Sequence, residues 1–287
     1  MERKKLIIFL LLAFLPMVGN GIAIYFLDGS QASTYAKSIV MYILTSGAMF
    51  IPMLAVIITQ LIYKERLFSG IEISFNINRW WFIGWLLTPL IAMAVVGVTL
   101  LMPEAQWAPI EAVTKSMPEE LGTWGLIAVS LLSGLFAGIT INAVFAFGEE
   151  VAWRGFLVKE FKGMKFLYFA LFSGIIWGFW HAPLILNGHN YSQHSVIGIF
   201  MMVVFCVLFT PILMYFRQKS GTVIVPAIIH GTFNGVAGLS MLLIYPVNDL
   251  LYGATGLAGF IVLFIVDLSL YLYDRFISRE NIFSSLI

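Results

Sequence analysis

Long apolar runs, separated by short polar segments, set the pattern of this chain. A run of about 20 apolar residues is long enough to cross a hydrocarbon core about 30 Å thick as a helix. Backbone groups inside lipid must find their hydrogen bonds within the segment, so we expect these runs to be helices. The eight predicted spans are Leu6–Leu27, Ser38–Tyr63, Trp80–Leu101, Trp124–Leu157, Leu167–Leu186, Val196–Phe216, Val223–Tyr245 and Ala254–Tyr273.

The composition agrees with a protein that lies mostly inside the bilayer. Of 287 residues, 60% are hydrophobic and 11% are charged, whereas a soluble domain has about 25% charged residues. We therefore predict an all-α, multi-pass protein of the cell membrane, with residues 1–287 forming one domain surrounded by lipid. The absence of a basic block argues against a nucleic-acid partner, and the single Cys206 excludes an internal disulfide.

The charges of the connecting segments predict how the helices are oriented. With the N-terminus in the cytoplasm, only Lys37 and Lys115 of the 16 basic residues fall in outer segments. Cytoplasmic loops of membrane proteins carry this excess of Lys and Arg, so eight spans with both termini cytoplasmic are expected. The longest outer loop, Met102–Gly122, carries Glu104, Glu111, Glu119 and Glu120 and is predicted to be a solvated acidic loop.

The first apolar run has a second interpretation. Arg3, Lys4 and Lys5 ahead of an apolar stretch imitate a signal peptide. The apolar part of a signal peptide has about 7–15 residues, and this run is longer and lacks a clear small-x-small cleavage site. A retained first helix is therefore favoured, and cleavage would leave the other helices in the same orientation.

Two adjacent carboxylates interrupt the fourth apolar run. Glu149 and Glu150 stand in the pattern Glu149-Glu150-x-x-x-Arg154. Glu150 and Arg154 are one helical turn apart and can form an ion pair, which reduces the cost of placing both in a membrane. Glu149 lies about 100° around the helix and has no charged partner in its own segment. Each charge at mid-bilayer costs roughly 2.5–3.5 kcal/mol, so this carboxylate requires a partner elsewhere or a function.

Two further patterns place polar side chains in apolar helices. His181 follows Trp177 by one turn, and His230 precedes Asn234 by one turn, so the last two share a helix face. A single histidine or asparagine of this kind can simply connect helices by a hydrogen bond. The other two histidines, His189 and His194, fall in a predicted outer loop and are expected to be surface residues.

Taken together, a spare carboxylate, two imidazoles and a carboxamide are the components of a general-base hydrolase. Glycine pairs accompany each pattern: Gly134/Gly138, Gly174/Gly178 and Gly231/Gly235. Small residues at this spacing let helices approach closely, so we expect the three helices to surround one centre.

These motifs, in this order, resemble the CAAX protease and bacteriocin-processing (CPBP) family of intramembrane endopeptidases, which includes the type II CAAX prenyl endopeptidase. The resemblance covers Glu149 to Asn234, about a third of the chain, and departs at Trp177, where the family more often has Phe. It implies an eight-helix bundle with a cavity open to the cytosolic side. Glu149 and His181 would activate a water, His230 and Asn234 would bind the oxyanion, and Glu150 and Arg154 would brace the first helix.

The resemblance leaves the cofactor open. Glu149, His181 and His230 could form a zinc site with water as the fourth ligand. The usual local HExxH signature is missing from the sequence, which favours a metal-free mechanism.

Three functions therefore follow from the sequence. The first is an intramembrane endopeptidase that acts on a peptide or protein substrate at the membrane. The alternative is a non-enzymatic bacteriocin-immunity or scaffold protein of the same fold. A proton-coupled transporter would use the carboxylates as a relay, but such transporters contain inverted repeats or broken helix pairs that this sequence does not show.

Overall fold

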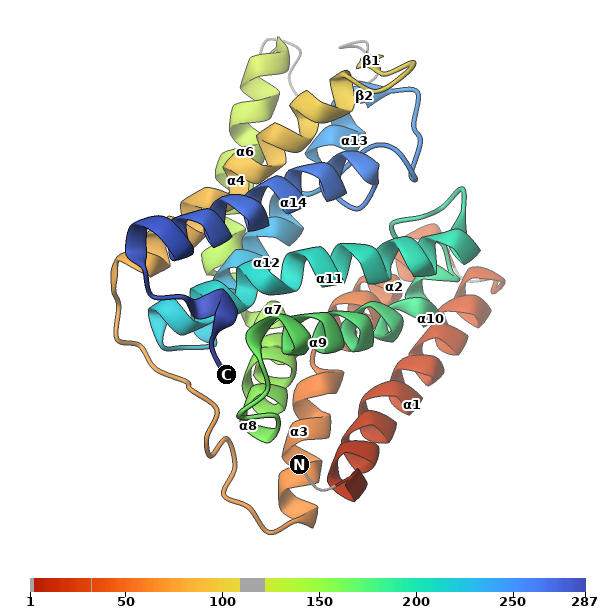
Figure 1. Cartoon of the computed structure of the whole chain (residues 1–287). Coiled ribbons are helices and arrows are strands. Elements are labelled where there is room, and N and C mark those ends of the chain that lie inside the picture. Colours follow the sequence, from red (N-terminus) through yellow and green to blue (C-terminus); the bar gives the residue numbers. More distant parts are fainter. Residues whose placement is uncertain (1–2, 32, 109–121) are drawn as a thin grey trace.

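The computed structural model describes residues 3–31, 33–108 and 122–287, and these are almost entirely helical (Figure 1). The longer helices are α1 (Arg3–Asp28), α2 (Thr34–Ala48), α3 (Ile51–Ile62), α4 (Arg79–Leu100), α6 (Gly122–Ile139), α7 (Ile141–Glu150), α9 (Phe166–Trp180), α11 (Ser195–Ser220), α12 (Ile224–Val236) and α14 (Leu257–Leu272). Short helical pieces are η2 (Val151–Phe156), α8 (Leu157–Glu160), α10 (Ala182–Ile185), α13 (Leu239–Leu243), η3 (Tyr273–Ser278) and η4 (Ile282–Ser284).

The prediction of an all-α, multi-pass membrane protein is confirmed. Within the described ranges, seven stretches of helix are long and apolar enough to cross a membrane, and α2 with α3 makes an eighth if this bent pair counts as one span. The two helices meet at an angle of 45°. Pro52 lies in the first turn of α3, where its missing N–H removes no hydrogen bond, so it can begin a new helix after the bend.

Three of the predicted spans that carry site residues are broken and do not form single continuous helices. The predicted span Trp124–Leu157 is divided at Thr140 into α6 and α7, which then continues as η2 and α8. The next span breaks at His181, two residues before Pro183, and separates α9 from α10. The seventh breaks between α12 and α13. All three breaks lie in spans that carry candidate site residues.

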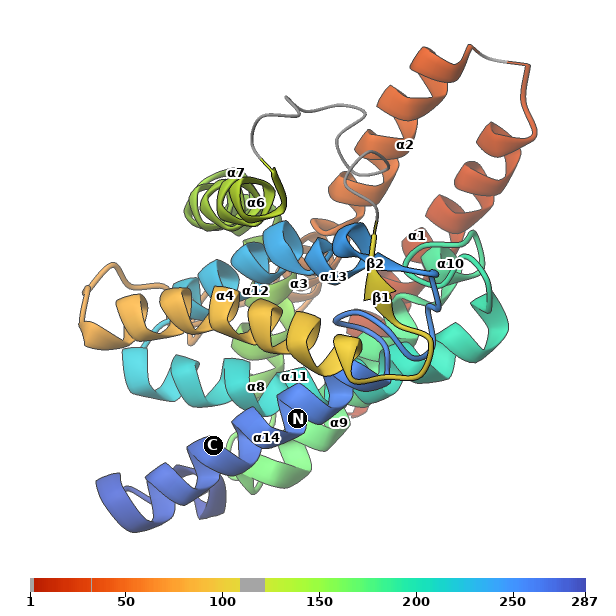
Figure 2. The same cartoon turned by 90° about the horizontal axis from the view of Figure 1, so that it is seen from above.

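Close packing around α12 brings these spans together. Figure 2 shows α12 between α6 on one side and α4 and α11 on the other. A Cβ added at Gly134 would lie 3.0 Å from the backbone of Gly235, and one at Gly138 would lie 2.5 Å from the Cα of Thr232. Only glycine allows α6 and α12 to approach so closely. The expected role of the glycine pairs is confirmed for these two helices.

The glycine pair of α9 packs against a different helix. Cβ atoms added at Gly174 and Gly178 of α9 would meet the backbone of Val207 and Val203 on α11. α9 and α11 are accordingly in contact along their length (Figure 1).

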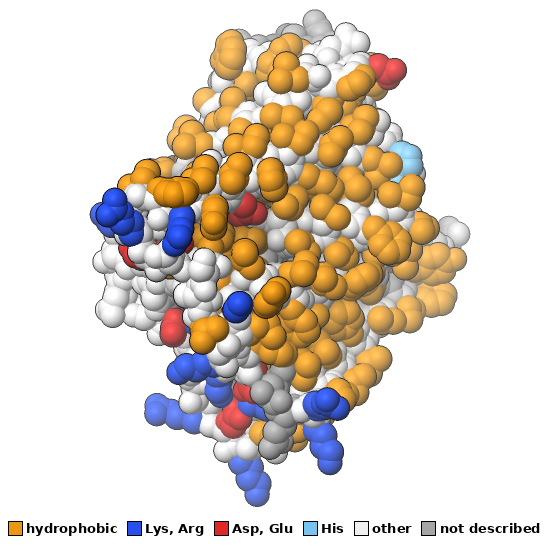
Figure 3. Space-filling model, in the orientation of Figure 1, with side chains coloured by type: hydrophobic (Ala, Val, Ile, Leu, Met, Phe, Trp, Pro, Cys, Tyr) orange, Lys and Arg blue, Asp and Glu red, His pale blue; other side chains and the backbone are white. Residues whose placement is uncertain are grey.

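The two described ends of the chain lie beside the same turn. Lys5 of α1 forms ion pairs with Glu65 and with Glu160 of α8. Near the C-terminus, Ile287 exchanges backbone hydrogen bonds with Gly163 and Met164. In the view of Figure 3, Lys and Arg gather along the lower and left edges of the molecule and hydrophobic side chains cover most of the remaining surface. The structure therefore places both ends on one side, as the charge pattern predicts.

Two short strands connect the segments at the opposite end. β1 (Gln106–Trp107) pairs antiparallel with β2 (Ile244–Tyr245). In the predicted acidic loop, Glu104 is exposed. Glu111, Lys115, Glu119 and Glu120 lie outside the described residues.

Candidate active site

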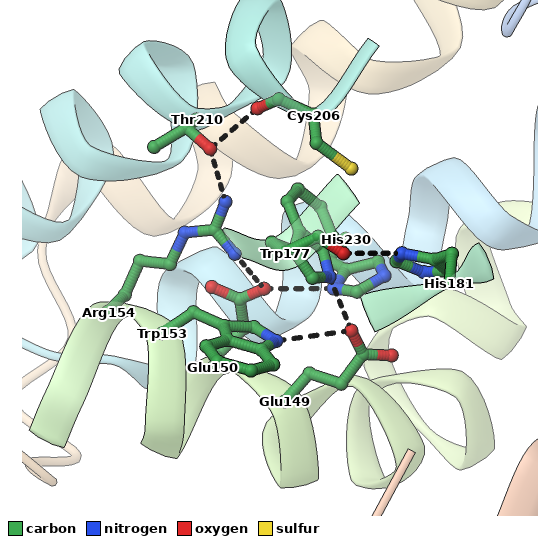
Figure 4. A network of polar contacts seen from close by, with 9 residues as sticks. All are labelled: Glu149, Glu150, Trp153, Arg154, Trp177, His181, Cys206, Thr210 and His230. Carbon is green, nitrogen blue, oxygen red and sulfur yellow. Dashed lines mark hydrogen bonds and ion pairs between the residues drawn. The ribbon is translucent and has the colours of Figure 1, made fainter. Parts of the chain in front are cut away.

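A cavity of about 450 Å³ lies between α2, α7, α9, α11 and α12. Four predicted site residues line it, and they are Glu149, His181, His230 and Asn234. The other two, Glu150 and Arg154, are fully buried behind it. The structure therefore brings all six predicted residues to one place (Figure 4 draws five of them).

Glu149, in the last turn of α7, is held by one of its two carboxylate oxygens. Its Oε2 accepts hydrogen bonds from the indole N–H of Trp177 at 2.6 Å and of Trp153 at 3.4 Å (Figure 4). Its Oε1 makes no hydrogen bond within the described part of the chain, and the side chain borders the cavity. One oxygen thus fixes the carboxylate while the other is free to act on a bound molecule.

His181 ends α9 on the same side of the cavity. Its Nδ1 lies 2.8 Å from the backbone oxygen of Trp177. Because a carbonyl oxygen only accepts, Nδ1 carries the proton and, in the neutral ring, Nε2 has the free lone pair. The geometry thus fixes the tautomer that presents a basic nitrogen.

Glu150 connects two helices behind the cavity. Its Oε1 accepts a hydrogen bond from Arg154 Nη1 at 3.1 Å, so the predicted ion pair is confirmed. The same oxygen lies 2.9 Å from Nδ1 of His230 on α12. The brace predicted for the first helix therefore also orients one of the two cavity histidines.

Arg154 has two further partners besides Glu150. Its Nη2 donates to Thr210 Oγ1 at 2.8 Å, and its guanidinium carbon lies 4.1 Å from the centre of the Trp177 ring. Guanidinium groups are attracted to the faces of aromatic rings, most strongly where water is excluded. These contacts stabilise a cation that no water reaches.

Asn234 lies one turn beyond His230 on the same face of α12, as the spacing predicts. His230 is 5% exposed, whereas Asn234 is exposed and makes no hydrogen bond within the described residues. Its amide is thus available to a bound molecule.

The helix that supplies both glutamates widens directly after them. Residues Val151–Phe156 form a π-helix, and the N–H of Leu157 bonds to the carbonyl of Ala152, five residues earlier. Single π-turns in α-helices often occur at functional sites.

The lining of the cavity includes His189 and Asn190, which belong to a loop that the charge pattern assigns to the outer side. At the opposite end, the residues from Val151 to Val158 are buried, and Ile71 packs against Gly155. The opening of the cavity to the cytosolic side stays a prediction.

The sequence left open a metal site formed by Glu149, His181 and His230. Within the described residues, no group of three His, Cys, Asp or Glu side chains is arranged to hold a metal ion. This result includes the proposed set of Glu149, His181 and His230, so no chemical step is assigned to a metal.

Sequence reasoning missed three contributors to the site. Trp153 lies one turn after Glu149, and that spacing alone could have predicted its contact. Trp177 was noted in the sequence only as a departure from the family pattern, but it donates to Glu149, and its ring lies against both His181 and His230. Thr210 comes from a distant span, and no local pattern indicates that it meets Arg154.

The fold and the cavity define a polytopic membrane protein with a buried site of carboxylates and imidazoles. Residues 123–236 match the model of the family described as type II CAAX prenyl endopeptidase Rce1-like, and all six predicted site residues lie in this segment. The match covers less than half of the chain and supports the resemblance to the CAAX protease and CPBP family that the sequence motifs indicate. Neither a curated protein nor a solved structure matches the chain.

Proposed function

We propose that this protein is an intramembrane endopeptidase that hydrolyses peptide bonds by a water activated at Glu149. The observation that carries the proposal is the Glu149 carboxylate, held through Oε2 by two indoles, with Oε1 free at a cavity that His181 and His230 also line. A general base must be fixed in place and must have an open position for the water it deprotonates. Glu149 meets both requirements.

In the proposed mechanism, a water between Glu149 and His181 attacks the carbonyl carbon of the scissile bond. Glu149 Oε1 takes one proton of the water, and Nε2 of His181 accepts a hydrogen bond that orients it. The carboxylic acid of Glu149 then returns its proton to the leaving amine.

His230 and Asn234 would bind the oxyanion of the tetrahedral intermediate. The amide of Asn234 donates directly, and His230 donates from Nε2 when its Nδ1 proton is held by Glu150 and the ring is an imidazolium. In that form Glu149, Glu150, Arg154 and His230 together carry no net charge. A neutral set of four is the least costly way to keep these groups in a membrane. Donors of this kind typically lower the barrier by about 3–4 kcal/mol.

The cavity wall favours a substrate that is itself apolar. Phe145, Phe205, Phe209 and Phe233 line it, and Tyr42 of α2 lies at its border. Aromatic walls with a few convergent polar groups are typical of sites that bury apolar ligands. We propose a peptide segment of a membrane-associated protein as the substrate.

The test is proteolysis by the purified protein, with and without a strong chelator, beside Glu149→Gln. We expect hydrolysis of a membrane-inserted fluorogenic peptide to fall by roughly 10²–10⁴ in the variant, because the amide cannot take the proton. The matched control is Glu72→Gln, which changes an exposed glutamate outside the cavity. Full turnover by Glu149→Gln would end the proposal, and loss of activity on chelation would replace the metal-free mechanism.

A bacteriocin-protection assay separates the alternative. If protection survives the simultaneous changes Glu149→Ala and His230→Ala, the chain acts in immunity or as a scaffold without catalysis. Loss of both protection and proteolysis in that double variant supports the enzyme.

A further inference from the structure

Asp267 is an acidic residue of α14, in the middle of the candidate span that α14 and η3 form together, and it lies away from the proposed active site. The span that contains it runs from Leu257 to Ser278, so Asp267 is 10 residues from one end and 11 from the other. At 1.5 Å per residue, the carboxylate lies about 15 Å from either end of the helix. This is the position at which a charge is least tolerated by lipid.

Among the described residues, no side chain neutralises this carboxylate. Oδ1 of Asp267 is buried and has no hydrogen-bond partner, and no ion pair to Asp267 occurs among the described residues. The side chain is only half-buried. It therefore borders the lipid-facing surface and is not enclosed in the core.

The surface around Asp267 is an exposed apolar ridge. Phe264 and Tyr271 lie one turn before and after it and are 59% and 38% exposed. Leu268 beside them is 44% exposed. Figure 3 shows hydrophobic side chains covering most of this face of the molecule. A transmembrane helix could therefore pack on α14 and cover the carboxylate.

We propose that this face of α14, centred on Asp267, docks a transmembrane helix of another membrane protein that carries a Lys or Arg at mid-membrane. An intramembrane acidic group is tolerated when a basic group pairs with it, and the part of the chain that the structure describes supplies none here.

A second copy of this chain does not fit the same face. Arg154 is fully buried and bonded to Glu150 and Thr210, so it cannot reach a second copy. Two copies meeting at α14 would instead bring two Asp267 side chains together. Charge complementarity thus points to a different protein with a basic residue.

The experiment uses labelled full-length protein in phosphatidylcholine vesicles and two synthetic transmembrane peptides. Both are polyleucine helices; one has a central Lys and the other a central Leu. We expect energy transfer to show that the lysine peptide binds about 5- to 30-fold more tightly, the range for polar contacts between helices in membranes.

Substitutions of Asp267 test whether this residue causes the preference for the lysine peptide. Asp267→Leu and Asp267→Asn are expected to abolish the preference for the lysine peptide, since the second keeps the side-chain shape without the charge. The control is Ser269→Ala, because the exposed Ser269 hydroxyl already bonds to the carbonyl of Ile265 within its own helix. Elution in detergent like the unchanged protein verifies that each variant is folded.

Three results would overturn the proposal. Equal binding of both peptides would show that the carboxylate attracts no basic helix. A preference that persists in Asp267→Leu and Asp267→Asn would place the contact elsewhere. Association of the protein with itself that depends on Asp267 would identify a second copy as the occupant. Because none of these readouts measures proteolysis, the outcome is independent of the proposed enzyme activity.

Discussion

Removing the buried Glu150 charge provides a sharp test of how the site is held together. Glu150 and Arg154 are fully buried and bonded to each other. Glu150→Leu leaves the guanidinium with only Thr210 and the Trp177 ring as partners. Breaking one side of a buried ion pair costs about 3–5 kcal/mol, because the remaining charge is uncompensated. At roughly 2–4 °C per kcal/mol, the melting temperature is expected to fall by about 6–20 °C.

The double variant Glu150→Leu with Arg154→Met removes both charges. Replacing a buried pair by apolar side chains is often neutral or stabilising, so we expect most of the lost stability to return. Peptide hydrolysis is not expected to return, because Nδ1 of His230 has lost the acceptor that orients it. Stability and activity should therefore separate in this one variant.

Scanning fluorimetry in one detergent and hydrolysis of the fluorogenic peptide measure the two quantities side by side. Glu150→Gln is the control, since its amide oxygen can still accept a hydrogen bond from His230 or Arg154. If the double variant is destabilised by the sum of the single changes, the ion pair does not explain the stability. If activity recovers with stability, Glu150 has no part in positioning His230.

Three further outcomes are expected. Trp177→Phe keeps an aromatic ring but removes the N–H bonded to Glu149. The loss of a hydrogen bond to a charged group should lower kcat roughly 10- to 100-fold with KM little changed. An unchanged kcat would contradict this. Gly138→Ala forces a methyl group into the backbone of α12 and should lower the melting temperature, because overpacking costs about 1–3 kcal/mol, while Gly97→Ala, which meets nothing within 4 Å, should not. Burial alone would raise the pKa of Glu65, but the two lysines that pair with Glu65 lower its pKa below the ordinary 4.5. The ion pairs of Glu65 therefore stabilise the fold above pH 4.5, and this stabilisation is lost as the pH falls through the depressed pKa. Glu65→Gln should accordingly reduce acid sensitivity in pH-dependent melting.

The sequence predicted the helices well because lipid leaves the backbone little choice. Apolar runs identified most spans to within about five residues, but the span predicted to end at Leu157 ends at Ile139. The spacing of Glu150 with Arg154 predicted a pair that the structure contains. These features depend on neighbours along one helix. Periodicity is sufficient to find them.

For contacts between helices, the sequence predicted only that the helices carrying the motifs would meet at one place. The glycines indicated that α6 and α12 meet, but nothing local indicated that Glu150 would bond to His230 or that Thr210 would reach Arg154. The direction in which the cavity opens depends on how η2, α8 and Ile71 pack at one end, and no local pattern indicates that packing. Asp267 was overlooked, since a single acid in an apolar run has no spacing that marks it.

The wide turn after Glu150 has a consequence for how this helix can change. A π-turn accommodates one residue more than an α-helical turn does, so the residues after it are rotated relative to those before it. The additional residue therefore fixes how the carboxylates at the cavity are oriented relative to Lys159 and Glu160. Lys159 pairs with Glu65, and Glu160 pairs with Lys5. Shortening the segment Val151–Phe156 by a residue would let the helix relax to the regular form and turn one of these two ends away from its partners. The length of this short stretch is thus a constraint as strict as the identity of the residues beside it.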